Sequence, residues 1–104
     1  MQSTRLIIFL RGAVLAALLA VAGCQTAPPV QEMSDARQAI MAAKEAGAAE
    51  HASDDLQAAV DFLESAERSI NAENYAQARR DALQAKAKAH DALRLSETGR
   101  QDKP

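Results

Sequence analysis

The stretch that decides the fold is Tyr75–Leu93, YAQARRDALQAKAKAHDAL, in which alanine recurs every three or four residues. This spacing places the alanines on one face of an α-helix, because about 3.6 residues complete each turn. Alanine also has the highest helix propensity. The positions on this face are Tyr75, Ala78, Ala82, Ala85, Ala89 and Ala92, with Leu83 and Leu93 beside them. Because alanine is small, this face predicts a helix lying unusually close to its neighbours.

Upstream residues repeat the pattern twice and predict two more helices. One face holds Met33, Ala36, Ile40, Ala43 and Gly47; the other holds Leu56, Ala59, Leu63, Ala66 and Ile70, with Val60 beside them. No glycine lies between Ala48 and Thr98, and no proline between Val30 and Lys103. Because β-branched and aromatic residues are scarce, strands are not expected. We therefore predict helices over 33–51, 54–71 and 74–97.

Capping residues mark the breaks between these helices. Ser53 suits an N-cap, and two acids follow it in the first turn, where the helix dipole favours negative charge. Asn71 can close the second helix in the left-handed conformation, and Asn74 can open the third. Since such short loops connect antiparallel neighbours, the predicted fold is all-α: an antiparallel three-helix hairpin or bundle with alanine-rich, coiled-coil-like seams. Few bulky residues are available for its core, namely Ile40, Leu56, Val60, Leu63, Ile70, Tyr75, Leu83 and Leu93.

Charge is divided along the chain. Residues 32–72 hold nine acids and three bases, whereas residues 73–104 hold seven bases and five acids. This division suits docking of a mildly basic third helix on two acidic ones. Residues 24–104 carry fourteen acids and ten bases, a net charge of −4. Nucleic-acid binders need a basic face, so nucleic acid is not an expected partner.

The N-terminal residues have the order of an export signal. Arg5 and Arg11 precede an uninterrupted apolar run, Ala13–Ala22, which is followed by the small residue Gly23. A bilayer-spanning helix needs about 20 apolar residues, and Arg11 limits this run to roughly half that length. We therefore predict that residues 1–23 form a cleaved signal peptide.

The chain's single cysteine stands at the end of this signal. The sequence Val21-Ala22-Gly23-Cys24 resembles the lipobox of bacterial lipoproteins. That resemblance implies cleavage between Gly23 and Cys24, a diacylglycerol thioether on the Cys24 sulfur and an acyl chain on its amino group. Two or more alkyl chains hold a protein stably on a membrane. Gln25 stands where inner-membrane lipoproteins commonly carry aspartate, so the resemblance favours the periplasmic face of the outer membrane over the inner membrane.

The remaining organisation follows from the prolines and the C-terminal residues. Pro28 and Pro29 disfavour helix and extend the preceding residue, so residues 24–32 are predicted to be a lipidated tether. Residues 33–97 form the helical domain, and 98–104, with Gly99, charges and a final proline, form a flexible tail.

No catalytic, cofactor or metal site is predicted. His51 with Glu50 or Asp54 could contribute to a zinc site, but zinc needs about four converging ligands, and both histidines are expected at the surface. A possible interaction surface comprises Tyr75, Arg79 and Lys86. The segment around Tyr75 is similar to the start of a tetratricopeptide-type helix, so this ring either plugs the end of the bundle or contacts a peptide.

The residues from Ala36 to Leu93 resemble the domain of unknown function 4398 family, whose members are small, alanine-rich envelope lipoprotein domains. The matching positions are Ala36, Ala39, Ile40, Ala43, Ala46, Gly47, Ala48, Leu56, Ala59, Asn74, Tyr75, Ala78 and Arg79. The family brings no known activity. Some relatives are joined to an OmpA-like peptidoglycan-binding domain; no such domain is expected in these residues, so the resemblance does not imply direct binding to the wall.

The expected function is a lipid-anchored, non-enzymatic helical module of the periplasm. It would act as a structural part or through a protein partner or a second copy, with no small-molecule substrate. The alternative is a peptidoglycan-associated, envelope-stabilising lipoprotein. Small major lipoproteins of that kind end in a lysine that attaches to the wall, whereas this sequence ends Lys103-Pro104.

Overall fold

The computed structural model describes Ile8, Arg11 and residues 27–101. Within 27–101 the chain forms the helices α2 (Val30–Glu45), α3 (Ala48–His51), α4 (Ser53–Asn71) and α5 (Tyr75–Gln101), with no strand in that range. The predicted all-α fold is confirmed. Most of the predicted signal peptide 1–23, the lipobox, Cys24 and Gln25 lie outside the described residues.

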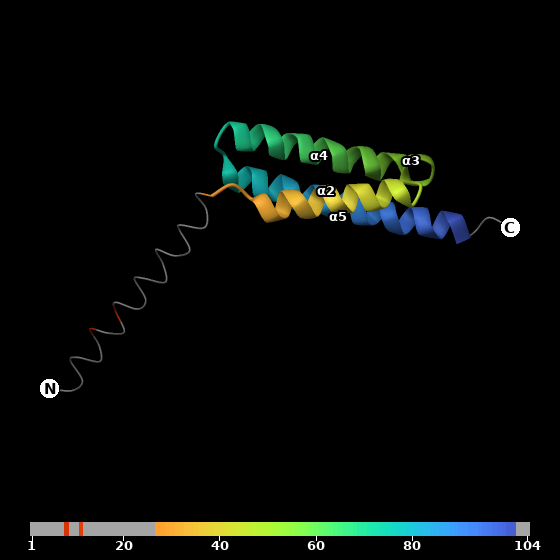
Figure 1. The fold of residues 1–104 in the computed structure, drawn as a ribbon, viewed down its shortest axis with the longest axis horizontal. Helices are drawn as coiled ribbons and strands as arrows, with labels where there is room; N and C mark the ends of the chain where they lie inside the picture. Colours follow the sequence, from red (N-terminus) through yellow and green to blue (C-terminus); the bar gives the residue numbers. More distant parts are fainter. Residues whose placement is uncertain (1–7, 9–10, 12–26, 102–104) are drawn as a thin grey trace.

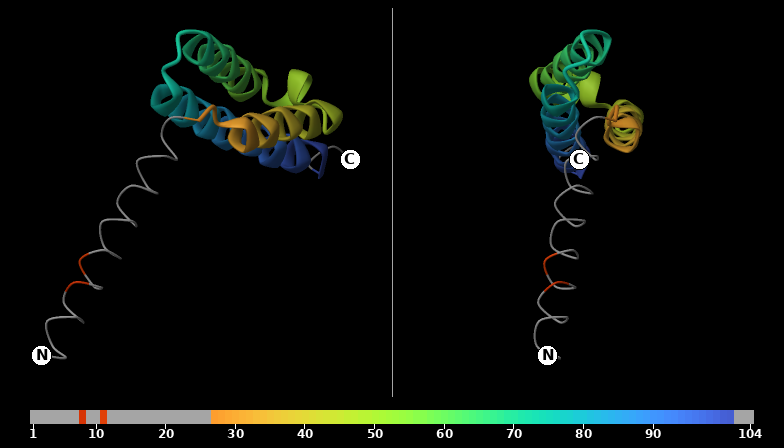
Figure 2. Two further views of the ribbon diagram at one scale, coloured as in Figure 1. Left: turned by 60° about the vertical axis from the view of Figure 1, so that its left-hand side comes forward. Right: turned by 90° about the vertical axis from the view of Figure 1, so that its left-hand side faces the viewer.

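The three long helices run up, down and up. Figures 1 and 2 show α4 returning antiparallel to α2, and α5 running antiparallel to α4, so that α2 and α5 are parallel. α5 contacts both other long helices extensively, whereas α2 and α4 touch each other less. Val30 therefore lies at the end of the bundle that holds the α4–α5 turn, and Gln101 at the opposite end, beside α3.

The alanine face of α5 is buried as predicted. Ala78, Ala82, Ala85, Ala89 and Ala92 are all 0% exposed. The face continues beyond the predicted alanines, because Ser96 is also fully buried and its hydroxyl donates to the Ala92 carbonyl at 2.7 Å. At the next position, Gly99 lies against the side chain of His51.

This continuation corrects the predicted C-terminal boundary. We expected the helix to end at 97 and residues 98–104 to be flexible, but α5 runs through Gly99 to Gln101. Gly99 occupies the buried face, where a Cβ would lie only 3.3 Å from Nδ1 of His51. The glycine thus serves close packing inside the helix and does not end it.

The larger apolar side chains pack in two clusters around α5. Ile40 and Leu56 are buried in one cluster, with Val60, Leu63 and Leu93 packed against it; Met33 is buried in the other, against Leu63 and Ile70. The prediction that Leu83 belongs to the core is wrong, because its side chain is 51% exposed. Ten residues separate Leu83 from Leu93, which turns their side chains about 80° apart on the helix. Only Leu93 reaches a cluster.

The first predicted helix begins earlier than expected and is interrupted. α2 starts at Val30 directly after Pro29, whose carbonyl accepts the Met33 N–H at 3.0 Å, so the expected tether 24–32 becomes helical at its end. Proline suits this place because the first helical turn leaves its N–H groups without intrahelical partners. Gly47, with φ +92°, separates α2 from α3. This backbone region is open to glycine and strained for other residues.

Two of the three predicted caps are wrong. Ser53 is the first helical residue of α4 and Ala52 precedes it without a side-chain cap. In the α4–α5 turn the left-handed residue is Glu73, with φ 60°, and Asn71 is the last residue of α4. Asn74 is confirmed as the cap of α5, because its Oδ1 accepts the Gln77 N–H at 3.4 Å.

Candidate functional site

The three residues of the predicted interaction surface lie on the first half of α5. Tyr75 is half-buried at the start of the helix. Arg79 Nε lies 3.2 Å from Glu32 Oε1, and Lys86 Nζ lies 3.7 Å from Asp35 Oδ2. Both cations thus pair with acids of α2, as the division of charge along the sequence predicts. Their role in binding a partner stays a prediction.

A buried carboxylate between α4 and α5, that of Asp81, was not predicted from the sequence. Asp81 is 7% exposed, and its two oxygens accept hydrogen bonds from Ser65 Oγ at 2.8 Å and Gln77 Nε2 at 2.9 Å. Asp81 directly precedes Ala82 and lies at the edge of the alanine face, where the sequence pattern does not show whether a charged side chain is buried or solvated. Because the alanine face repeats about every seven residues, a shift of α5 by seven residues along its neighbours would again place alanines at the contact. The alanines alone therefore specify the register of α5 weakly. The Ser65–Asp81 hydrogen bond joins α4 to α5 in the observed register.

His51 and His90 lie in different surroundings and are far apart in the sequence. The side chain of His51 is 19% exposed and packs on Gly99, with Nε2 3.9 Å from Glu50 Oε2. His90 is exposed on the middle of α5. Among the described residues, no three histidine, cysteine, aspartate or glutamate side chains gather in a way that could hold a metal ion.

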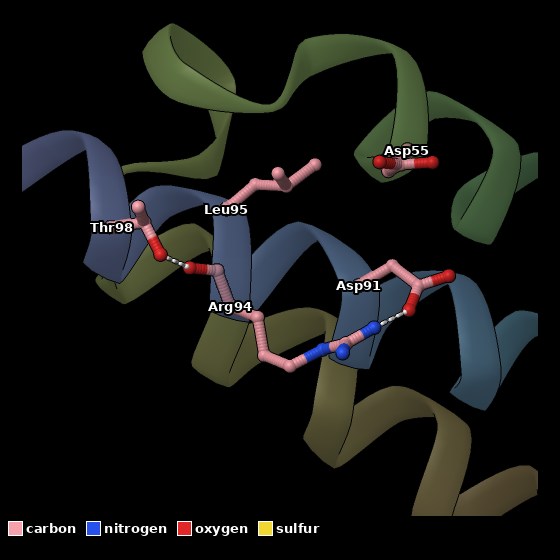
Figure 3. Close-up of a pocket in the computed structure, with 5 residues that line it drawn as sticks. All are labelled: Asp55, Asp91, Arg94, Leu95 and Thr98. Carbon is pink, nitrogen blue, oxygen red and sulfur yellow. Dashed lines mark hydrogen bonds and ion pairs between the residues drawn. The ribbon is translucent and has the colours of Figure 1, made fainter.

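Two open grooves flank α5 on the surface. One, of about 390 Å³, lies between α2 and α5 and is lined by Asp35, Gln38, Ala39, Ala42, Lys86 and His90. The other, of about 490 Å³, lies between the start of α4 and the end of α5 and is lined by Asp55, Asp91, Arg94, Leu95 and Thr98. Figure 3 shows the second groove, with Leu95 projecting from α5 toward the α3–α4 segment and Arg94 extended along α5 to Asp91. Both are shallow and of mixed polarity, which suits contact with a macromolecule better than enclosure of a small ligand.

These features define a small, alanine-packed helical bundle with ion pairs and a Ser65–Asp81 hydrogen bond between its helices. The chain belongs to the family described as a domain of unknown function (DUF4398), whose model matches residues 31–103. The resemblance noted from the sequence is therefore confirmed, and the match extends beyond Leu93 to include the end of α5. Comparisons with curated proteins and with solved structures found no match.

The predicted lipid-attachment residue, Cys24, and the predicted cleavage at Gly23 lie outside the described residues. Within the part of the chain that the structure describes, no helix is both long and apolar enough to cross a bilayer.

Proposed function

We propose that this protein is a lipid-anchored envelope lipoprotein that acts, without catalysing a reaction, as a helical structural or interaction module in the periplasm. The observation that carries the proposal is the sequence Val21-Ala22-Gly23-Cys24 at the end of a ten-residue apolar run, which itself follows a charged segment. A lone cysteine at that place has a ready use as the attachment point of alkyl chains. Three such chains bind a membrane far more stably than one.

The arrangement of the helices supports a positional role. The tether from Cys24 joins the bundle at Val30, beside the α4–α5 turn, and α5 extends from there for 27 residues. A helix of that length spans about 40 Å. An anchor at Cys24 would therefore hold the turn end near the membrane and present the α3 end and the C-terminus farther away.

The polar groups of the bundle also support a role without catalysis. Several charged side chains pair between helices, as Arg37 and Glu67 do between α2 and α4 at 3.3 Å. The buried Asp81 is occupied by its two hydrogen bonds and lies between helices instead of in a cavity.

The anchor is tested by growing the native host with an alkyne-tagged fatty acid and isolating the full chain. We expect the wild-type protein to carry the tag and to sediment with the outer membrane, and Cys24→Ala to lose the tag. A membrane-free, untagged wild-type protein would overturn the proposal.

Sorting is tested by Gln25→Asp, with Gln25→Asn as the matched control. We expect the aspartate variant to move to the inner-membrane fraction and the asparagine variant to stay with the wild type. Sedimentation of purified peptidoglycan with the chain separates the alternative, because a wall-associated lipoprotein is retained on the wall after detergent extraction.

A further inference from the structure

We infer that the groove between α4 and α5 lined by Asp55, Leu95 and Arg94 docks a helix of a partner protein. That helix would place an aliphatic side chain on Leu95 and a lysine or arginine beside Asp55. The inference deepens the proposed function by naming the surface and the chemistry of its partner.

The apolar part of this surface is Leu95. Its side chain is 51% exposed although it lies at the edge of a groove of about 490 Å³. Figure 3 shows it projecting from α5 toward the α3–α4 segment, between Asp55 on one side and Thr98 and Arg94 on the other. An aliphatic side chain in a concavity with a polar rim resembles the centre of a protein–protein interface in composition.

The charged part of the surface is Asp55, which has no hydrogen-bond or ion-pair partner among the described residues. Two carboxylates between α2 and α5 are paired, Glu32 with Arg79 and Asp35 with Lys86. The nearest cation in the groove, Arg94, is paired with Asp91 on its own helix. The groove therefore holds two acids and one base, a net charge of −1, and a cation from a partner would complement it.

The position of Asp55 in the first turn of α4 gives it a second role, because the helix dipole favours acids there. Asp54 shares that role and is exposed. The dipole explains both acids, but it does not explain an exposed leucine facing one of them across a groove. The pair Asp55 and Leu95 is what distinguishes this surface from an ordinary helix start.

The form of the groove favours a helix as its occupant. Its walls are two helices, and a third helix packs into such a groove by fitting its ridges of side chains between theirs. Leu95 lies twenty residues after Tyr75, which places it about 30 Å along α5 from the turn end. In the anchored protein this surface would face away from the membrane.

A second copy of the chain is a poorer occupant. Two exposed pairs of a leucine and an arginine lie on α5: Leu95 with Arg94, and Leu83 with Arg80. Arg94 is paired with Asp91 of its own helix, so the first pair offers no free cation to Asp55 of another copy. Leu83 is twelve residues before Leu95, which is about 18 Å nearer the turn end. Two copies anchored in one membrane with the same orientation would hold Leu83 and Leu95 at different heights. The surface is therefore assigned to a different protein.

The test is photocrosslinking in the native host, with a benzophenone amino acid at position 95 of the full chain. Position 83 is the matched control, because Leu83 and Leu95 are equally exposed leucines on the same helix. We expect position 95 to give a discrete adduct with another protein, and position 83 to give little of it. The adduct peptide should carry apolar residues at helical spacing with a lysine or arginine among them.

Charge reversal tests the role of Asp55. Asp55→Lys should lower the adduct yield from position 95 by about tenfold or more, because like charges facing each other in a contact are strongly repulsive. Asp54→Lys, which places the same change in the same helical turn, should leave the yield near that of the parent. Replacing the partner's mapped cation by glutamate should restore the yield with Asp55→Lys.

An adduct with the chain itself, equal yields from positions 83 and 95, or an Asp55→Lys yield equal to that of Asp54→Lys would each overturn the inference. Fatty-acid labelling of the same cells reports separately on the anchor. A labelled, membrane-bound chain without the expected adduct would contradict this inference and leave the proposed function standing.

Discussion

Ala89→Leu tests the close packing of α5 on its neighbours. Ala89 is 0% exposed, and its cluster contains Ala39 from α2 and Ala59 from α4. Leucine adds three carbon atoms at a place where small residues from three helices meet. Overpacking of a tightly packed core costs about 1–3 kcal/mol, and we expect the upper part of that range because neighbouring alanines have no rotamers with which to adapt.

Ala87→Leu is the matched control, because Ala87 is exposed on the same helix two residues away. Alanine and leucine differ in helix propensity by only a few tenths of a kcal/mol, so its free energy of unfolding should be nearly that of the parent. Urea unfolding, followed by far-ultraviolet circular dichroism on a soluble form that begins at Gln25, measures both variants. If m is about 1 kcal/mol/M, a loss of about 2 kcal/mol lowers the midpoint for Ala89→Leu by about 2 M.

A loss below about 0.5 kcal/mol for Ala89→Leu, or an equal loss for Ala87→Leu, would contradict the close packing of α5 on α2 and α4. Either result would mean that the helices do not pack at the short separation that alanine side chains allow. An unchanged sedimentation coefficient for Ala89→Leu confirms that the measured change belongs to the bundle and not to a new oligomer.

Three further substitutions test the polar and glycine positions by the same unfolding assay. Asp81→Ala should lower stability by about 1–3 kcal/mol because it removes the hydrogen bonds that Ser65 and Gln77 donate to a buried carboxylate; no loss would show that these hydrogen bonds contribute nothing. Gly99→Ala alone should be nearly neutral, because a gain in helix propensity of about 1 kcal/mol is offset by crowding against His51. In a chain that also carries His51→Ala, the crowding is removed and Gly99→Ala should be stabilising. If the effects of the two substitutions simply add, the contact between the two positions is ruled out. Glu73→Gly should raise stability by up to about 1 kcal/mol by relieving a left-handed non-glycine backbone, and a loss would contradict the strain assigned to that turn.

The helical fold could be predicted because the sequence signals are local and repeated. The alanines of α5 recur at helical spacing without a glycine or proline among them, and every one of those on the predicted face is buried. The division of charge also predicted that basic residues of α5 would meet acids of α2. These signals depend on periodicity and composition, which a single sequence displays fully.

The features that the sequence did not reveal depend on contacts between distant segments. Gly99 ends a helix in most contexts, and only the docking of α3 makes it a packing position inside α5. Asp81 reads as a solvated charge until Ser65 is placed opposite it by the return of α4. Leucine is typical of a core, so the sequence alone does not show that Leu83 and Leu95 are exposed. Whether each side chain is covered depends on which helices lie beside it.

The residues proposed for binding a partner also differ in whether the sequence alone could reveal them. Tyr75, Arg79 and Lys86 could be selected from the sequence as unusual residues on one helix. Asp55 and Leu95 are forty residues apart, and their proximity follows only from the antiparallel pairing of α4 with α5.

The most direct test of the central claim is the intact mass of the N-terminal peptide of the protein purified from its native host. We expect a peptide that begins at Cys24 and carries the added mass of a diacylglyceryl group and an amide-linked acyl chain. A peptide with an unmodified Cys24 thiol, or one that still contains residues 1–23, would contradict the lipid anchor on which the proposed function depends.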